Sequence, residues 1–394
     1  DLASPTSGAV ITLINVVSTD PGVTGFTSAG ATFLNGSKLT DRLTSTVNTT
    51  ETVTYTFEVA ANGCVNPITE VRVVTVNPTP TILATPSAQT ICDDDFTAIS
   101  LTNPNMVAGT TFSWTVSADP GITGASASSL PGPGVIAQQL SNSNVFAGNV
   151  VYTITPISPD LCAGTPFIVT ISVDPDLIAD SGPAQVVCEG TTVTLGGTPT
   201  ATGGSGSYSY EWYGPGSFSS ALSNPTNILP PNLGINTYKV VVKDNRGCIS
   251  DTSFVDITVD QIPIIDAGFD TEICENATAS LNAISGGSTT SITWSAGVGS
   301  FDNPNILNAV YTPPTIINDT TIILTITTND PAGPCTSVQD QVAVRVVKLP
   351  TLVITNLGNP PYAENTPPFV LEAVPVGGTF SGPGVNSITG EWNP

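Results

Sequence analysis

Apolar and polar residues alternate along short stretches of this chain, and the alternation has a period of two. Thr and Ser occupy the polar positions while Val, Ile, Phe and Tyr occupy the apolar ones, a pattern typical of half-buried antiparallel strands. Turn-forming pairs such as Asn62-Gly63 separate the stretches. The clearest strands are predicted at residues 52–59, 169–173, 238–242, 321–326 and 342–346. Many short strands with frequent turns predict an all-β chain built of β-sandwiches.

The strand pattern recurs together with the cysteines, which indicates an internal repeat. Residues 18–25 return in similar form as residues 117–124, and Cys64 and Cys162 are separated by almost the same distance. Such a period predicts a tandem array of similar domains. We name the predicted domains one to five: residues 1–77, 78–174, 175–260, 261–348 and 349–394. Domain one is expected to lack its beginning and domain five its end.

The joints between the predicted domains are short and contain proline, as in residues 77–80, 174–176, 260–263 and 348–350. Proline fixes φ and extends the backbone, whereas Gly/Ser-rich linkers would be flexible. The array is therefore expected to form an extended rod in which neighbouring repeats contact each other. With strands of about 8–10 residues, each domain would be roughly 35–45 Å long and the chain on the order of 160–200 Å.

Six of the seven cysteines form pairs that are about 60 to 70 residues apart. The predicted disulfides lie within single domains: Cys92–Cys162, Cys188–Cys248 and Cys274–Cys335. Cys64 takes the position of a second cysteine, so its partner is expected before Asp1. Structural bridges are favoured over reactive thiols, since closing loops of this length stabilises a small domain by roughly 4 kcal/mol. Widely spaced pairs indicate an oxidising, extracytoplasmic location.

The composition excludes several classes of function. The formal net charge is −23, although only 10% of residues are charged, and there is no histidine. An acidic chain has no footprint for nucleic acid or for anionic membranes. Without histidine the commonest general base is missing, and no recognisable catalytic motif occurs, so we predict that the segment is not an enzyme. No run of residues approaches the roughly 18 apolar positions of a membrane helix.

Three tryptophans, Trp114, Trp212 and Trp294, recur at one place in domains two to four. A sugar-stacking role is the alternative, but a repeated position favours a core anchor. Domain one has Asn15 at this place, so its core must differ or shift. Tyr213 follows Trp212 on the same strand and is expected to point the other way, to the surface.

Acidic residues at the joints are weak candidates for calcium binding, since oxygen ligands between domains would stiffen the array. No D-x-D-x-D-G loop occurs, and solvated acids or turn caps are the preferred interpretation. No other cofactor is expected. The candidates are Asp93, Asp94, Asp95, Asp174, Asp176, Asp260 and Asp266.

Several segments resemble the PKD-like and immunoglobulin-like repeats of very large secreted Bacteroidota proteins, such as the gliding-motility surface adhesins of the SprB type. Residues 240–248 look like that family's strand-turn-cysteine signature, and residues 377–385 resemble the opening of a related Ig-like repeat. In domain two the matching segments are residues 90–92, 110–116, 150–156 and 169–175.

The resemblance implies Ig-like and PKD-like sandwiches in the stalk of an adhesin or filament that is exported by the type 9 system and attached to the outer membrane. It also implies Thr320, in an Asp-Thr-aliphatic context, as a glycosylation candidate. Surface polysaccharide and the secretion or motility machinery would be partners. Two alternatives stay open: the domains themselves bind a glycan or a protein, or they are accessory repeats of a secreted hydrolase.

Overall fold

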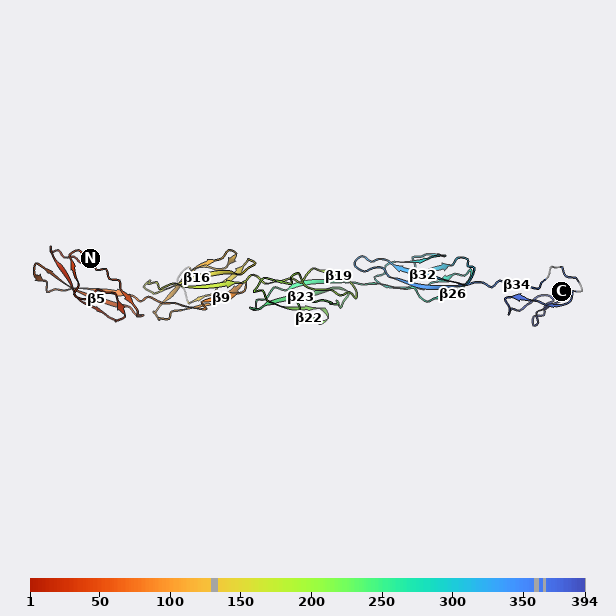
Figure 1. Cartoon of the computed structure of the whole chain (residues 1–394), viewed down its shortest axis with the longest axis horizontal. Helices are drawn as coiled ribbons and strands as arrows, with labels where there is room; N and C mark the ends of the chain where they lie inside the picture. The colour runs from red at the N-terminus through yellow and green to blue at the C-terminus, as the bar shows by residue number, and fades with distance from the viewer. Residues whose placement is uncertain (129–133, 358–360, 364–365, 394) are drawn as a thin grey trace. The chain divides into compact units, whose positions relative to one another are not determined.

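A computed structural model describes residues 1–394 except 129–133, 358–360, 364–365 and 394. The described residues form β-strands and a single 3₁₀ turn at Pro215–Ser217, with no α-helix among them (Figure 1). The described residues contain no helix that is long and apolar enough to cross a membrane. The chain divides into two compact units. The first comprises residues 1–183, 194–226 and 238–255, and the second comprises residues 184–193, 227–237 and 256–394.

Domain one lies in the first unit and is built around β5, which pairs with β1 on one side and with β7 on the other. Its core consists of Ile11, Leu13, Val53, Tyr55 and Phe57, with apolar neighbours around them. The strands are β1 (Val10–Ser18), β2 (Val23–Thr24), β3 (Thr32–Leu34), β4 (Thr44–Ser45), β5 (Glu51–Ala61), β6 (Cys64–Val65) and β7 (Glu70–Val76).

Domain two, also in the first unit, has a sheet in the order β12-β16-β17-β9, in which β9 runs parallel to the closing strand β17. Alternate residues of β16 and β17 face the core, and Tyr152, Ile154 and Ile171 are fully buried. The strands are β8 (Leu83–Thr85), β9 (Ala88–Ile91), β10 (Asp95–Phe96), β11 (Ile99–Thr102), β12 (Thr111–Ala118), β13 (Ile122–Thr123), β14 (Val135–Ile136), β15 (Gln139–Asn142), β16 (Gly148–Ile157) and β17 (Phe167–Val173).

The strands of domain three follow one another along the chain in an order similar to that of domain two. In the first unit, β21 pairs with β22 and with β23, and Trp212 on β21 is fully buried. In the second unit, β19 runs parallel to the end of the closing strand β24. The strands are β18 (Ile178–Ala179), β19 (Gln185–Cys188), β20 (Ala201–Thr202), β21 (Tyr208–Gly214), β22 (Phe218–Ser220), β23 (Gly234–Asp244) and β24 (Ser253–Asp260).

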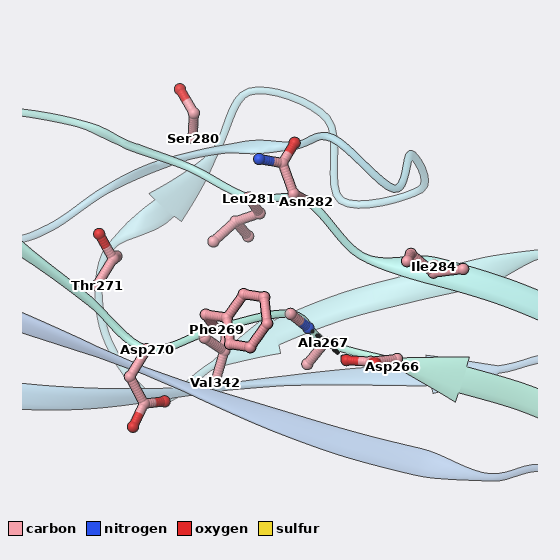
Figure 2. Close-up of a pocket in the computed structure, with 11 residues that line it drawn as sticks. Asp266, Ala267, Phe269, Asp270, Thr271, Ser280, Leu281, Asn282, Ile284 and Val342 are labelled. Carbon is pink, nitrogen blue, oxygen red and sulfur yellow. Dashed lines mark hydrogen bonds between the residues drawn. The ribbon is translucent and has the colours of Figure 1, made fainter.

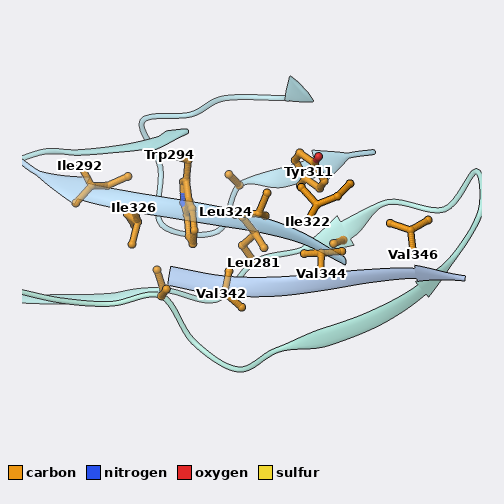
Figure 3. Packing of buried hydrophobic residues seen from close by; sticks show 14 of the residues in the cluster. Leu281, Ile292, Trp294, Tyr311, Ile322, Leu324, Ile326, Val342, Val344 and Val346 are labelled. Atoms are coloured by element: carbon orange, nitrogen blue, oxygen red, sulfur yellow. The ribbon is translucent and has the colours of Figure 1, made fainter. Parts of the chain in front are cut away.

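Domain four, in the second unit, repeats the arrangement with a sheet in the order β26-β33-β32-β29. Figure 3 shows its core, in which Trp294, Leu324 and Val344 lie among other apolar side chains of facing strands. The strands are β25 (Pro263–Asp266), β26 (Thr271–Cys274), β27 (Ala279–Ser280), β28 (Ile284–Gly287), β29 (Ile292–Ala296), β30 (Ser300–Phe301), β31 (Val310–Thr312), β32 (Thr320–Thr328) and β33 (Gln339–Val347).

Domain five has only short strands in its described residues: β34 (Val353–Ile354), β35 (Phe369–Val370), β36 (Ala373–Val374) and β37 (Glu391–Trp392). β34 pairs with β36 and β35 pairs with β37. The ring of Trp392 packs edge-on against Phe369, so an aromatic cluster takes the place of an extended core.

The predicted all-β fold of tandem sandwich domains is confirmed, and so is the core role of two tryptophans. Trp212 and Trp294 are buried, while Trp114 packs against the core of domain two and stays partly exposed. In domain one, β1 shifts its register between Leu13 and Asn15, and Leu13 is fully buried. A β-bulge thus accommodates the polar residue that stands where domains two to four have tryptophan.

Candidate functional site: disulfide-bridged junctions

The first cysteine of domains two, three and four lies at the end of a strand that runs parallel to the closing strand. Cys188 is in register with Asp260 at the end of β24, and Cys274 with Val347 at the end of β33. In domain two, Ile91 is in register with Val173, so Cys92 follows at the same level as Asp174. The parallel pairing therefore places every first cysteine at the C-terminal end of its domain's closing strand.

The second cysteine lies at the opposite end of its domain, in the loop before the closing strand. Two of these loops are the same tight turn. The backbone N–H of Asp244 donates to the carbonyl of Cys248 (3.0 Å), and the N–H of Cys248 donates to the Asp244 side chain (2.9 Å). Ser158 and Cys162 make the equivalent bonds, at 3.0 and 3.2 Å. The side chain at the start of the turn thus holds the cysteine in place.

The predicted pairing within domains is wrong. The structure joins Cys92 to Cys248 and Cys188 to Cys335, with Cα atoms 5.7 and 5.3 Å apart. Each bridge links the first cysteine of one domain to the second cysteine of the next. The three unbonded cysteines are Cys64, Cys162 and Cys274, so neither Cys92–Cys162, Cys188–Cys248 nor Cys274–Cys335 is formed.

The length of the closing strand explains the error. Closing strands of 7, 8 and 9 residues separate the two cysteine positions of domains two, three and four. Such strands are roughly 23 to 30 Å long at about 3.3 Å per residue. A disulfide requires Cα atoms within about 7 Å of each other. Cysteines at opposite ends of one domain are thus too far apart to bond, whereas each lies close to the neighbouring domain.

An ion pair accompanies the bridge between Cys92 and Cys248. The carboxylate of Asp174, which directly follows β17, is buried, and both of its oxygens accept from Nη1 of Arg246, at 2.7 and 2.5 Å. Arg246 belongs to the turn that holds Cys248. The junction of domains two and three is therefore held by a disulfide and by a charge pair, and no sequence pattern singled out Arg246.

The backbone of domain three closes against the joint from the other side. Gly204 donates its N–H to the carbonyl of Pro175 (3.0 Å). The neighbouring Gly203 has φ +81°, and the carbonyl of Asp176 leaves no space for a Cβ there. Glycine is needed where two backbones approach this closely. The loop around Gly203 and Gly204 thus fixes the short joint after β17.

Asp244 is the buried acid that organises the turn of Cys248. Burial alone would raise its pKa, but hydrogen bonds from Ser205, Cys248 and Arg246 outweigh burial and hold the pKa of Asp244 below its ordinary value. An acid with a lowered folded-state pKa contributes stability above its unfolded pKa, and loses it as the pH falls through the folded value. The turn is therefore stabilised by ionised Asp244 at neutral pH.

We predict that the Asp244→Asn variant loses the acid-sensitive part of this stability. Wild-type stability should decline as the pH falls from the ordinary aspartate range through the lowered pKa of folded Asp244. The variant should be less stable at neutral pH and should show a smaller decline over this range. Denaturant unfolding at a series of pH values measures both slopes, and equal slopes would contradict the assignment.

The bridge between Cys188 and Cys335 also lies beside an acidic residue that ends a closing strand, but it has no equivalent of Arg246. Asp260 is opposite Cys188, and its carbonyl accepts from the N–H of Glu189 (2.9 Å). Gly333, two residues before Cys335, lies against the Asp260 carboxylate at the position that Arg246 has before Cys248. On the far side of the joint, Ser288 donates its N–H to the carbonyl of Ile262 (3.2 Å).

The three unbonded cysteines occupy the same places as the bonded ones. Cys162 is partly buried and lies in a copy of the Cys248 turn. Cys64 is exposed in β6, after the strong strand of domain one, and so has the position of a second cysteine. Cys274 is exposed at the end of β26, the position of a first cysteine. The predicted bond of Cys64 to a cysteine before Asp1 stays a prediction.

The calcium candidates are only partly brought together. Partial burial, with the nearby charges of Asp93, Asp251 and Asp94, raises the pKa of Asp176. Asp93 accepts from the N–H of Asn142 (2.5 Å), and Asp95 and Asp266 each accept from a nearby backbone N–H. Asp260 lies apart, at the second bridge. Calcium binding stays a prediction for these residues.

Two carboxylates and a disulfide sulfur lie within 4.8 Å of one another at Asp174, Asp244 and Cys248. These groups are already engaged: Asp174 is paired with Arg246, Asp244 accepts three backbone hydrogen bonds, and Cys248 is in a disulfide. The cluster therefore serves the junction itself and offers a cation little free coordination.

A surface hollow of about 520 Å³ lies in domain four, and Figure 2 shows its lining. Asp266 accepts from the N–H of Gly268 in its own turn, and Asp270 accepts from the N–H of Ala343 in β33 (both 2.8 Å), so both acids already bind backbone groups. Phe269 is almost fully exposed. The hollow presents no paired acid and base of the kind that catalysis requires.

Two further candidates are exposed residues of half-buried strands. Thr320 is the first residue of β32, and its hydroxyl donates to the carbonyl of Asn318 (2.9 Å). Its glycosylation stays a prediction. Tyr213 is 45% exposed beside buried Trp212, as predicted, and Lys239 lies over its ring at 5.7 Å.

Comparison with known proteins gives a family for one part of the chain. Residues 89–177, which include most of domain two, match the PKD-like domain family. No curated protein matches the sequence. Similar solved structures include Drosophila N-cadherin EC1–4, with 11% identity over 88% of this chain and 94% of that one and a TM-score of 0.31. A titin I-band fragment, I67–I69, has 11% identity over 68% of this chain and 99% of that one, with a TM-score of 0.38. Human CDH23 EC21–23 has 13% identity over 68% of this chain and 100% of that one, with a TM-score of 0.31.

Proposed function

We propose that these domains are a load-bearing stalk segment of a secreted cell-surface protein, in which disulfides carry tension from one domain to the next. The observation that carries the proposal is the connectivity of the bridges. Both join consecutive domains, and their loops overlap in the sequence, since Cys188 lies between Cys92 and Cys248. A bridge of this kind adds a covalent path across a joint that the backbone alone would otherwise cross.

The surface and the joints fit this role. The strands expose Thr and Ser, and the net charge of −23 keeps filaments from adhering to each other. Disulfides persist in oxidising compartments, which supports an extracellular location. From the sequence resemblance, the parent would be an adhesin for attachment or gliding in Bacteroidota, anchored at the outer membrane, with surface polysaccharide or the secretion or motility machinery as partners.

Small-angle scattering of oxidised residues 1–394 tests the stalk. An extended array of about 160–200 Å has a radius of gyration of about 50 Å, whereas a compact protein of this length has about 21 Å. We expect the larger value at several salt concentrations. A radius of gyration close to that of the compact protein would contradict a stalk.

A binding role for the domains is the second candidate, and exposed aromatic side chains such as Tyr213 and Phe269 favour it. A glycan array probed with the oxidised chain distinguishes the two functions. A saturable signal that is lost in the Tyr213→Ala or Phe269→Ala variant would replace the stalk by a binding function. A blank array is the result expected for a stalk.

A further inference from the structure

The last strand of domain one has an open edge. In domains two, three and four, a parallel strand pairs with the closing strand: β9 with β17, β19 with β24, and β26 with β33. Among the described residues, β7 pairs with β5 alone. Its free edge therefore presents unpaired backbone groups to a further strand.

The core-facing side of β7 is also uncovered at Val74, although Val76 at its end is buried. Val74 lies opposite Val53 and is 42% exposed. The equivalent residues, Ile171 opposite Val150 and Val344 opposite Ile322, are fully buried. In domain two this core includes three residues from the segment that contains β9 and β11: Ile91, Ile99 and Leu101. Among its described residues, domain one has no such segment beside β7, and Val74 is left exposed.

Cys162 lies in domain two, beyond the joint that follows β7. β7 ends at Val76, so a parallel strand in the usual register would place its last residue beside Asn77, the equivalent of Asp174 beside Cys92. Gly164, next to the Cys162 turn, lies so close to the carbonyl of Pro80 that no Cβ would fit. A hollow of about 260 Å³ at this joint is lined by residues 48–50 and 78 of the one side and 107–108 and 158–160 of the other.

We propose that β7 and Cys162 form one acceptor site for a parallel β-strand that ends in cysteine, of the kind that β9, β19 and β26 provide in the following domains. Two observations on different domains require the same occupant: the edge of β7 requires a strand, and the unbonded Cys162 requires a cysteine at that strand's end.

The bond forms by thiol–disulfide exchange. The Cys162 thiol releases its proton, and the thiolate attacks the strand's cysteine, which is held as a mixed disulfide with a small thiol. The new S–S bond replaces the old one, and the small thiol leaves with the proton. No net oxidation occurs in this step.

A peptide probe tests the site on the chain as it stands. The peptide has the sequence of residues 86–102, and its cysteine carries glutathione as a mixed disulfide. Exposure alone predicts faster reaction at exposed Cys64 and Cys274 than at partly buried Cys162. We expect the reverse order, with Cys162 at least about tenfold faster by mass mapping, because strand docking raises the effective concentration of the peptide.

Three controls keep the result decisive. A peptide of the same composition in scrambled order should react at Cys162 no faster than at Cys274. The Val74→Asp variant should slow the reaction at Cys162 and leave Cys274 unchanged; if that variant unfolds, the scrambled peptide decides alone. Equal rates at the three cysteines, or with both peptides, would overturn the proposal. Covalent dimers formed through Cys162 without peptide would assign the site to a second copy instead and would also overturn it.

Discussion

Pulling the oxidised chain by its two ends is expected to separate Cys92 and Cys335 by no more than about 220 Å. The fully unfolded backbone between these residues would reach about 870 Å, at about 3.6 Å per residue. Because the two bridges overlap, the shortest covalent path crosses from Cys92 to Cys248, returns along the backbone to Cys188 and crosses to Cys335. Adding a reductant should release the difference of about 650 Å, which single-molecule force spectroscopy measures directly.

Each bridge alone still shortens the path, and single variants reveal this. Without Cys335 the path crosses from Cys92 to Cys248 and follows the backbone onward, about 310 Å. Without Cys248 the chain runs from Cys92 to Cys188 and crosses to Cys335, about 350 Å. Only the double variant Cys248→Ser/Cys335→Ser should reach the reduced length under oxidising conditions. Bridges within single domains would keep Cys92–Cys162 in that double variant and limit it to about 620 Å, and that result would contradict the connectivity.

The alternation of residues was sufficient to predict the strands, because Thr at every second position leaves only one face apolar. It also predicted the buried Trp212 and Trp294, since a large apolar residue that recurs at one place is a core residue. Alternation carries no information on whether a neighbouring strand is parallel or antiparallel. The strand before Cys92 is parallel to β17, and this direction decides at which end of the domain the cysteine lies.

The side chains that hold the junction of domains two and three could not be predicted from the sequence for a related reason. Arg246 and Asp174 are separated by 72 residues and belong to different domains, so no local pattern connects them. One signal was present: an oxygen-bearing side chain stands four residues before both Cys162 and Cys248. It marks the turn that presents the cysteine to the preceding domain, and it becomes interpretable only when the turn's hydrogen bonds are known.

The Arg246→Ala variant is expected to destabilise the junction of domains two and three by about 2 kcal/mol. The Asp174 side chain is only 4% exposed, and removing its partner leaves a buried carboxylate without a counter-charge. Breaking a fully buried pair costs about 3 to 5 kcal/mol. The side chain of Arg246 is 47% exposed, so solvent screening lowers the effect. Denaturant unfolding of the oxidised chain measures the loss.

A second arginine of the chain supplies a matched control. Arg72 pairs with Glu70 at 2.6 Å, but both side chains are more than half exposed, so Arg72→Ala should cost less than about 0.5 kcal/mol. Adding Asp174→Asn to Arg246→Ala should restore part of the lost stability, because the amide carries no charge that needs a partner. If Arg246→Ala costs no more than Arg72→Ala, the disulfide alone holds the junction. The second bridge, where Gly333 replaces the arginine, would then be its complete equivalent.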